Sequence, residues 1–374
     1  MDGFTRRLAL SLAFDTAAPR LGPLLNAHRD DPVSDAGDGL PVSLLDDAGL
    51  PDPQRLNPWL PPALRQRRPV ATARLHGWAD QLRADGWQLL ALTDAHYPAL
   101  LAALPDAPGL LFVRGDSALL HAPQLAMVGA RNASPEGLGH AHRFAAALAE
   151  KGFVISSGLA LGIDAAAHEG ALSRGHTLAV MGGGPDRIYP PRHAALAARI
   201  VEQGGALVTE YPPGMAPRKE HFPLRNRIIS GLSLGVIVVE AALRSGSLIT
   251  ARLAAEQGRA VFAIPGALNN PLSRGCHRLL RDGAHWLESL DDVLAHFSDF
   301  TALAGSLNPQ DGGAQTSLPL APASGLLAHL HSGVNTLDDL ARRTGQSVAE
   351  LAAELARLEF SGQVRRVPGG YARC

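Results

Sequence analysis

A run of polar side chains in the second half of the chain has the composition of a site that holds an anion. Arg225, Asn226 and Arg227 follow one another, and a second polar segment, 244–252, combines arginines with serines and a glycine. Guanidinium groups, amides, hydroxyls and backbone N–H groups are common donors to phosphate oxygens. Neither segment brings a pair of carboxylates, a Cys–His pair or a cluster of metal ligands. We therefore expect an anion-binding surface and not a reaction centre, with no metal and no cofactor.

Alternating apolar and alanine-rich segments predict the elements that position these side chains. The six apolar segments expected to be strands are 125–129, 153–157, 177–181, 206–210, 236–240 and 260–264. The four segments with helical spacing are 136–150, 162–173, 192–203 and 247–257. Strands that are apolar throughout indicate a parallel sheet covered on both faces. The pattern predicts an α/β fold, a Rossmann-like, doubly wound and mostly parallel sheet.

Ligands of such a sheet bind beyond the carboxyl ends of the strands, and several polar turns fall there. The turns 129–134, 157–164 and 182–190 are expected to face the same edge as the two polar segments and to form a long phosphate-tracking surface. Ser134 and Pro135 are placed as the N-cap and first residue of a helix, where free N–H groups attract phosphate. Neither Gly-x-Gly-x-x-Gly nor the Walker A pattern occurs, so a dinucleotide or ATP site is unsupported.

Arg218, Lys219 and Phe222 place an aromatic ring beside cations. This mixture suits single-stranded nucleic acid, whose bases stack on aromatic rings while charge holds its phosphates. The alternative is that Phe222 is an ordinary core residue. Three consecutive glycines at 182–184 indicate either a positive φ angle or a close approach of the backbone.

Acidic and titratable residues at the strand ends leave other roles open. Asp164 could cap the following helix or hold Arg131. His168 and Glu169 could form a catalytic pair, although a capped or solvated pair is the favoured interpretation. Glu240 ends a predicted strand near the serines of the second polar segment. It motivates the alternative function, a nucleotide-hydrolysing enzyme of the phosphoribohydrolase type.

The bulk composition is typical of a soluble protein with more than one domain. The chain has 374 residues and a formal net charge of −1, which permits a local basic groove but argues against a wholly basic protein. Two cysteines are too few for a disulfide framework or a cysteine zinc site. No apolar run approaches the roughly 20 residues that span a membrane. We expect a cytoplasmic protein without a membrane partner.

The composition changes along the chain and predicts three domains. Residues 1–80 are expected to form a small helical domain of the SAM or helix-hairpin-helix type, and 81–297 the Rossmann-like domain with an N-terminal extension. Within that extension, 86–115 has the pattern of a connector with one edge strand. Residues 298–322 are rich in Gly, Pro, Ser and Gln and predict a linker. Residues 323–374 predict a winged-helix domain.

Capping-box spacings at 336–339 and 347–350, with a hairpin pattern at 362–373, are the basis for that winged helix. Its presumed recognition helix, 348–359, carries three glutamates and one arginine. DNA-facing helices are usually basic, so the pattern argues against readout of a duplex groove.

Taken together, the ordered motifs resemble the DNA-processing protein A family (DprA, also called Smf). In chain order the matching segments are VGAR ending at Arg131, SGLALGID ending at Asp164, DRIYP ending at Pro190, FPLRNRIISG ending at Gly231, RSGSLIT ending at Thr250, IPG ending at Gly266, and Gly275-Cys276. They cover about 115 to 297, nearly half of the chain.

The resemblance implies a dimeric protein whose Rossmann-like domain binds single-stranded DNA. Because the cationic turns converge without a catalytic constellation, we also expect that the protein is not an enzyme. It also implies that the protein protects incoming DNA and loads the RecA recombinase onto it during natural transformation. The residues expected to bind single-stranded DNA are Gly129, Arg131, Ser157, Gly158, Gly184, Asp186, Arg187, Lys219, Phe222, Arg225, Asn226, Arg227, Ser245, Gly246 and Ser247. By motif, Arg131 would hold a phosphate, and Lys219 and Phe222 would pair charge with stacking. Leu279 and Leu280 would lie toward the dimer and RecA-facing side.

Three positions depart from the family pattern. Leu161 stands where relatives commonly have Arg, which removes one possible phosphate contact. His277 stands where Asn follows the Gly-Cys pair, and Pro185 follows the glycines in an unusual form of the third turn.

Overall fold

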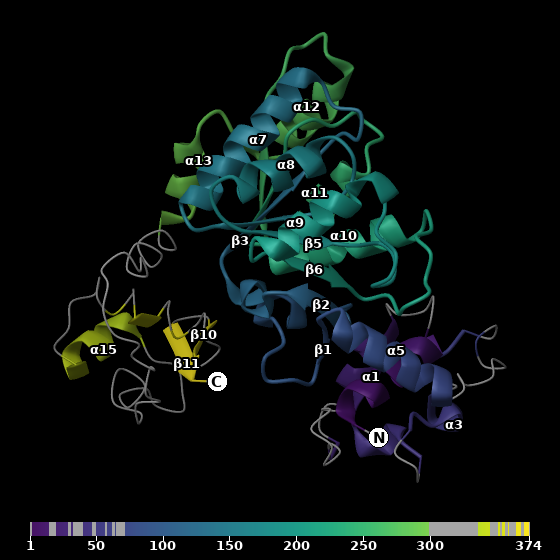
Figure 1. Cartoon of the computed structure of the whole chain (residues 1–374). Coiled ribbons are helices and arrows are strands. Elements are labelled where there is room, and N and C mark those ends of the chain that lie inside the picture. The colour runs from purple at the N-terminus through teal and green to yellow at the C-terminus, as the bar shows by residue number, and fades with distance from the viewer. Residues whose placement is uncertain are drawn as a thin grey trace, which may run out of the picture. The chain divides into compact units, whose positions relative to one another are not determined.

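The computed structural model divides the chain into two compact units, residues 1–296 and 297–374, each of which is considered by itself (Figure 1). Residues 72–298 are described without interruption. The other described residues are 2–14, 20–28, 31–32, 40–46, 50–56, 58–61, 64, 336–344, 351, 354–355, 358, 364–367 and 370–373.

One sheet of nine strands organises the first unit, in the order β1-β2-β6-β5-β4-β3-β7-β8-β9. Their bounds are β1 Trp87–Ala91, β2 Leu110–Gly115, β3 Gln124–Val128, β4 Val154–Ser157, β5 Thr177–Val180, β6 Ala206–Thr209, β7 Gly235–Val238, β8 Ala260–Ala263 and β9 His285–Trp286. All pairings between β6 and β9 in this order are parallel. The six predicted strands correspond to β3 to β8, and the mostly parallel sheet is confirmed.

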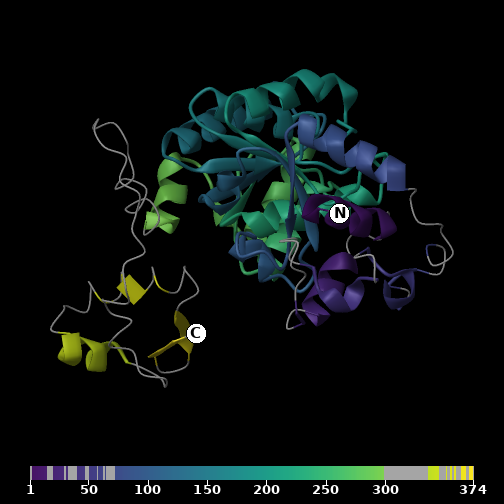
Figure 2. The same ribbon diagram turned by 60° about the horizontal axis from the view of Figure 1, so that its bottom comes forward.

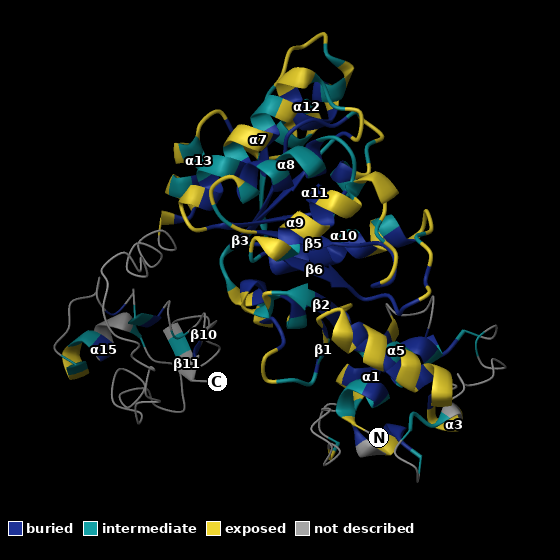
Figure 3. Cartoon of the chain, in the orientation of Figure 1, coloured by how far each residue is buried: buried dark blue, intermediate teal, exposed yellow. Residues whose placement is uncertain are grey.

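Helices cover both sides of the sheet, as Figure 2 shows, and the doubly wound α/β prediction is thereby confirmed. Following β3, they are α7 Pro135–Glu150, α8 Ile163–Leu172, α9 Ala194–Glu202, α10 His221–Leu232, α11 Ser247–Glu256, α12 Arg274–Arg281 and α13 Leu290–His296. Helix α7 packs against α8, and α10 against α11. The parallel strands β3 to β7 are buried throughout, while the outer helix faces are exposed (Figure 3).

The strand order reverses between β3 and β7. The chain proceeds from β3 through β4 and β5 to β6 on one side, and then returns to place β7 against the other side of β3. Loops leaving the carboxyl ends of these two neighbours therefore diverge, and a crevice opens between them. This switch point is where the fold predicts a ligand.

The expected connector at 86–115 is instead a two-stranded extension of the sheet. Strand β2 pairs antiparallel with β6, and β1 pairs antiparallel with β2, so two strands replace the one edge strand that was predicted. In β1, Trp87, Leu89 and Ala91 are buried and alternate with less buried residues. That short alternation between turn residues was the missed signal.

The N-terminal helices belong to the same compact unit as the sheet. They are α1 Gly3–Phe14, α2 Leu21–Ala27, α3 Pro53–Leu56, α5 Thr72–Ala84 and, after β1, α6 Ala99–Ala102. Arg7 of α1 donates to the carbonyl of Leu89 in β1 at 2.5 Å and pairs with Asp94. Their apolar side chains are part of a continuous core with those of the sheet.

The second unit has a small core of its own. Helix α15 (Leu337–Thr344) follows Thr336, as the first capping-box spacing predicts, and β10 (Val364–Val367) pairs antiparallel with β11 (Gly370–Arg373). Leu340, Leu351, Leu355 and Val364 are buried together. The linker 298–322, the second capping box and most of the recognition helix lie outside the described residues, apart from Ser298.

Candidate nucleic-acid interface

A cavity of about 480 Å³ lies at the switch point between β3 and β7. Nine of the expected binding residues line it: Gly129, Arg131, Lys219, Phe222, Arg225, Asn226, Ser245, Gly246 and Ser247. These nine residues come from three chain segments, 129–131, 219–226 and 245–247, which are thus brought together at one edge of the sheet. The location agrees with the rule that ligands of open α/β sheets bind where the strand order reverses.

Two exposed cations flank the cavity. Arg131 follows the carboxyl end of β3, and Lys219 precedes α10. The Arg131 guanidinium lies over the ring of Phe222, 5.2 Å from its centroid. Among the residues that the structure describes, no carboxylate comes within ion-pair distance of either cation. Both charges are therefore available to an incoming anion.

Arg225 places a buried positive charge beneath the same cavity. The residue is only 3% exposed, and its Nη1 atom donates to the carbonyls of Gly158, at 2.8 Å, and Val180. Burial lowers its pKa to about 10; Asp164 opposes this effect and Arg131 adds to it. The side chain thus remains protonated at neutral pH and acts on the cavity through its field.

The first turn of α11 supplies neutral donors. The Oγ atoms of Ser245 and Ser247 are 2.6 Å apart, and Gly246 is exposed between them. The N-cap, Gly246, provides no side-chain cap, and the N–H of Ser247 donates to the Oγ atom of Ser245 at 3.3 Å. Both serines line the cavity, so the positive end of the helix dipole lies at its edge, where anions are favoured.

Asp164 closes the turn at 157–164 instead of holding Arg131. Its Oδ2 atom accepts hydrogen bonds from the backbone N–H groups of Gly158, at 3.0 Å, and Ala160, at 3.3 Å. The N-cap of α8 is Gly162, without a side-chain cap. Burial raises the pKa of Asp164, although Arg225 and the two N–H groups act against the rise. Its role in the described structure is to shape the turn.

His168 and Glu169 do not form a catalytic pair. The Nε2 atom of His168 accepts from the N–H of Leu159 at 3.3 Å, and its Nδ1 atom lies 2.7 Å from Thr177 Oγ1. Thr177 donates to a carbonyl, so Nδ1 carries the ring proton. Leu159 has a φ of 56°, and the imidazole therefore supports a backbone conformation that non-glycine residues rarely adopt. Glu169 pairs with Arg199 on the surface.

The third turn lies outside the cavity, except at its end. Gly184 donates from its N–H to the carbonyl of Met215 at 2.9 Å, and Asp186 accepts from the N–H of Gly214 at 2.7 Å. A Cβ atom at position 184 would stand 2.2 Å from the carbonyl oxygen of Pro212, which accounts for this glycine. Arg187 pairs with its neighbour Asp186 and is exposed. The turn is thereby fixed to the loop at 212–215.

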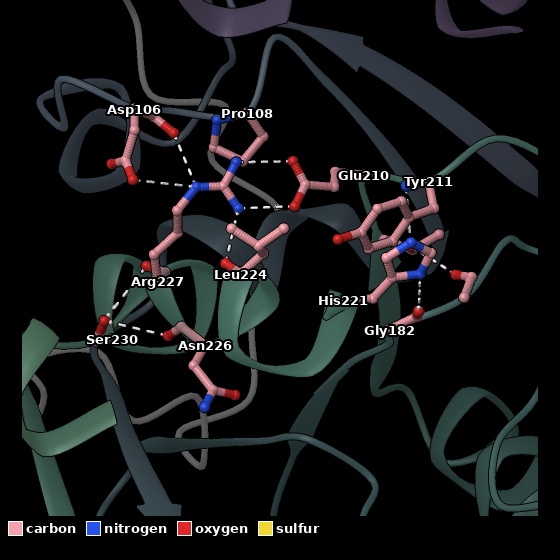
Figure 4. A network of polar contacts seen from close by, with 12 residues as sticks. Asp106, Pro108, Gly182, Glu210, Tyr211, His221, Leu224, Asn226, Arg227 and Ser230 are labelled. Carbon is pink, nitrogen blue, oxygen red and sulfur yellow. Dashed lines mark hydrogen bonds and ion pairs between the residues drawn. The ribbon is translucent and has the colours of Figure 1, made fainter. Parts of the chain in front are cut away.

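Arg227 was expected among the DNA-binding residues, but the structure places it in a buried ion pair away from the cavity (Figure 4). Its Nη1 and Nη2 atoms each donate to Glu210 at 2.7 Å, and its Nε atom donates to the carbonyl of Asp106 at 2.9 Å. Burial alone would lower the pKa of Arg227, but the adjacent Glu210 carboxylate outweighs that effect and raises it. Residues 225 and 227 lie about 200° apart around α10, so their side chains cannot both face the cavity.

Ser157 and Gly158 are also buried beneath the surface rather than at it. Ser157 donates from Oγ to the carbonyl of Met127 at 2.6 Å. Gly158 faces the guanidinium of Arg225, as described above. The residues expected at the site that do not line the cavity are Ser157, Gly158, Gly184, Asp186, Arg187 and Arg227.

Glu240 caps a helix and does not line the cavity. Its carboxylate accepts from the N–H of Ser134 at 2.9 Å and from the Ser134 hydroxyl at 2.6 Å. Ser134 in turn is the predicted N-cap of α7 and accepts from the N–H of Gly137. A Cβ atom at position 137 would come within 2.5 Å of the carboxylate. The residue that motivated the hydrolase alternative is thus accounted for by helix capping.

Leu279 lines a second cavity of about 670 Å³, which we name the α11–α12 groove. Leu243, Leu248 and Arg252 contribute to its lining from the α11 side. Leu280 is half-buried against the core and is not part of the lining. Ser245 lines both cavities, so the groove adjoins the switch-point cavity.

Leu161, Pro185 and His277, the positions that depart from the family pattern, also lie outside the lining of the switch-point cavity. His277 donates from Nε2 to the carbonyl of Gly266 at 3.0 Å.

Within the described part of the chain, no helix is both long and apolar enough to cross a bilayer. Nor do three or more His, Cys, Asp or Glu side chains of that part gather where they could ligate a metal ion.

The fold and the site define an α/β protein with a cation-lined crevice at its topological switch point. Residues 88–298 match the family model of the DNA recombination-mediator protein A, and residues 314–370 match that of the DprA winged-helix domain. The chain belongs to the DNA recombination-mediator protein A family.

Known relatives are similar to this chain over most of their own lengths. Protein Smf of Escherichia coli is 46% identical over 291 residues, which cover 76% of this chain and 77% of the relative. The solved structure of DprA from Streptococcus pneumoniae is similar with a TM-score of 0.59 and 42% identity, covering 65% of this chain and 85% of that one. A structure of DprA from Helicobacter pylori, described by its single-stranded DNA binding mode, is similar with a TM-score of 0.51 and 33% identity, covering 57% and 95%.

Proposed function

We propose that this chain is a recombination mediator that binds single-stranded DNA in the switch-point cavity, without an enzymatic activity of its own. The observation that carries the proposal is the pairing of two free cations, Arg131 and Lys219, with aromatic rings over the buried charge of Arg225. Cations hold phosphates, and rings accept bases, whatever the sequence of the strand.

The cavity lining favours binding over reaction. Asp164 is the one carboxylate that lines it among the described residues, and this group already accepts two backbone hydrogen bonds. Neither a nucleophile paired with a base nor a poised acid–base pair accompanies it there. The family name and the Helicobacter pylori relative support single-stranded DNA as the ligand.

The biological role follows from family membership. We propose that the protein acts in the cytoplasm as a homodimer, protects incoming single-stranded DNA during natural transformation and loads RecA onto it. The α11–α12 groove, with Leu279 in its lining, is the surface that we assign to the dimer and RecA-facing side. Its apolar floor beside several arginines is suited to a protein partner.

Two lysines make a matched test of DNA binding. Lys219 lines the cavity, whereas Lys151, the other lysine of the chain, caps the far end of α7, at the opposite edge of the sheet. Gel-shift titration with a single-stranded oligonucleotide should show weaker binding for Lys219→Ala and Arg131→Ala, and unchanged binding for Lys151→Ala. Wild-type affinity in both cavity variants would overturn the assignment of the cavity.

A further inference from the structure

Tyr189 places a second aromatic ring at the switch-point cavity. It lies near the end of the third turn, lines the cavity and is 48% exposed. Other large apolar side chains are exposed in the described structure, among them Leu243 and Trp286, but Tyr189 is the one that also lines this cavity. Because half of this ring is exposed beside two unpaired cations, a ligand in the cavity can stack on it.

Phe222, by contrast, lines the cavity but is half-buried, and its neighbours cover part of its ring. Arg131 covers the ring at 5.2 Å from the centroid, and the ring of Tyr189 lies tilted against it at a centroid distance of 5.6 Å and an interplanar angle of 46°. The backbone of Gly182 borders its edge, since a Cβ atom there would stand 3.1 Å from two ring carbons. Phe222 therefore forms part of the cavity wall and supports both Arg131 and Tyr189, and it offers less exposed ring surface than Tyr189.

We infer that Tyr189 is the residue on which an unpaired base stacks in this cavity, and that Phe222 positions it. The inference rests on the proposed binding of single-stranded DNA. A base can reach Tyr189 only if it is free of its own stack, and extruding a base from a duplex costs free energy. Stacking on Tyr189 is thus the element that discriminates single strands from duplexes, while Arg131 and Lys219 hold phosphates of either.

An abasic backbone separates these contributions. We compare the affinities of oligo(dT) and of an abasic oligonucleotide of equal length for the full-length chain. Tyr189→Ala should weaken oligo(dT) binding roughly 5- to 100-fold and leave abasic binding unchanged, because one base stack is lost. Tyr189→Phe keeps the ring and should bind both ligands as the wild type does. Phe222→Ala should weaken both, because Arg131 loses its support.

Trp286 provides the matched control, because it is an exposed aromatic residue on β9, 56% exposed and outside the cavity lining. Trp286→Ala should leave both affinities unchanged. Tyr189→Trp adds a direct readout: its fluorescence, measured as the difference from the wild type, should be quenched by oligo(dT) and not by the abasic strand.

The outcomes distinguish the two proposals. If the wild type binds neither ligand, the proposed function fails, and this inference fails with it. If the wild type binds oligo(dT) and Tyr189→Ala binds it equally well, the stacking role alone is overturned. An equal loss of oligo(dT) and abasic binding in Tyr189→Ala would also overturn it, since a backbone contact would then explain the effect.

Discussion

Arg225 lies so close to the backbone of Gly158 that a Cβ atom at position 158 would stand 2.5 Å from its Nη2 atom. The same guanidinium donates to the carbonyl of Gly158 at 2.8 Å. The buried guanidinium of Arg225 therefore joins helix α10 to the turn that follows β4. The absence of a side chain at 158 is what permits this arrangement.

Gly158→Ala should displace Arg225 and weaken both the fold and the site. We expect a loss of about 1–3 kcal/mol in the free energy of unfolding, as for other overpacked interiors, and a reduced affinity for single-stranded DNA. Urea unfolding and gel-shift titration measure the two effects. Gly77→Ala is the control: its Cβ would meet nothing within 4 Å on the exposed face of α5, so it should stabilise by about 0.5–1 kcal/mol. Wild-type stability in Gly158→Ala would contradict the close contact.

The ion pair between Arg227 and Glu210 should matter for stability and not for the ligand. Their side chains are 3% and 1% exposed. Removing one partner by Arg227→Ala leaves a buried charge unpaired and should cost about 3–5 kcal/mol. The exposed pair of Arg252 and Glu256 is the control, and Arg252→Ala should cost about 0.3–0.5 kcal/mol. A specific loss of DNA affinity in correctly folded Arg227→Ala protein would contradict this prediction and show that Arg227 takes part in DNA binding.

His168 should make the fold sensitive to acid. Burial first, and then the nearby His193 and Arg225, lower its pKa from 6.5 to about 3. Between pH 6.5 and 3, His168 therefore binds a proton in the unfolded chain but not in the folded chain. The free energy of unfolding consequently falls as the pH decreases through this range, by at most about 1.4 kcal/mol per pH unit. His168→Gln should flatten that slope in unfolding measurements between pH 7 and 5. An unchanged slope would show that the ring is protonated in the folded state.

Most of the sheet was predictable from the sequence, because buried parallel strands are apolar runs bounded by turns. Helix α10 was not predicted, since Pro223 and Gly231 interrupt its pattern. Both are compatible with the helix: Pro223 lies in its first turn, and Gly231 faces Leu101 and Leu104, which a Cβ would crowd. Missing this helix led directly to the error at Arg227, because consecutive polar residues share a surface in a turn but not on a helix.

The site was predictable to the level of the strand ends, and less so for individual side chains. Residue type indicates that Glu240 or Asp164 could act on a ligand, but only the structure shows that both are engaged by backbone N–H groups. Tyr189 was missed as a site residue. The sequence places it in the glycine-containing turn that follows β5, but whether an aromatic ring there is buried or exposed depends on its packing against Phe222.

Glu240 should contribute to the stability of α7 and to nothing catalytic. Glu240→Ala removes the acceptor of the Ser134 N–H and hydroxyl, and should destabilise the protein by about 1–2 kcal/mol. Ser134→Ala should cost a similar amount, and the double variant should cost less than the sum, since the two share one network. Incubation of the wild type with nucleoside monophosphates should release no base. Base release that is abolished by Glu240→Ala would establish the hydrolase alternative instead.

The salt dependence of the affinity should report how many phosphates the cavity residues neutralise. Binding to a single strand releases counterions, so the logarithm of the affinity falls with the logarithm of the salt concentration by about 0.7 for each phosphate neutralised. Removing Arg131, an exposed cation without a carboxylate partner in the described structure, should reduce the magnitude of that slope by about 0.7. Tyr189→Ala should lower the affinity and leave the slope unchanged, because stacking displaces no counterion. Gel shifts at several salt concentrations measure both slopes, and a slope unaffected by Arg131→Ala would exclude a phosphate contact at this residue.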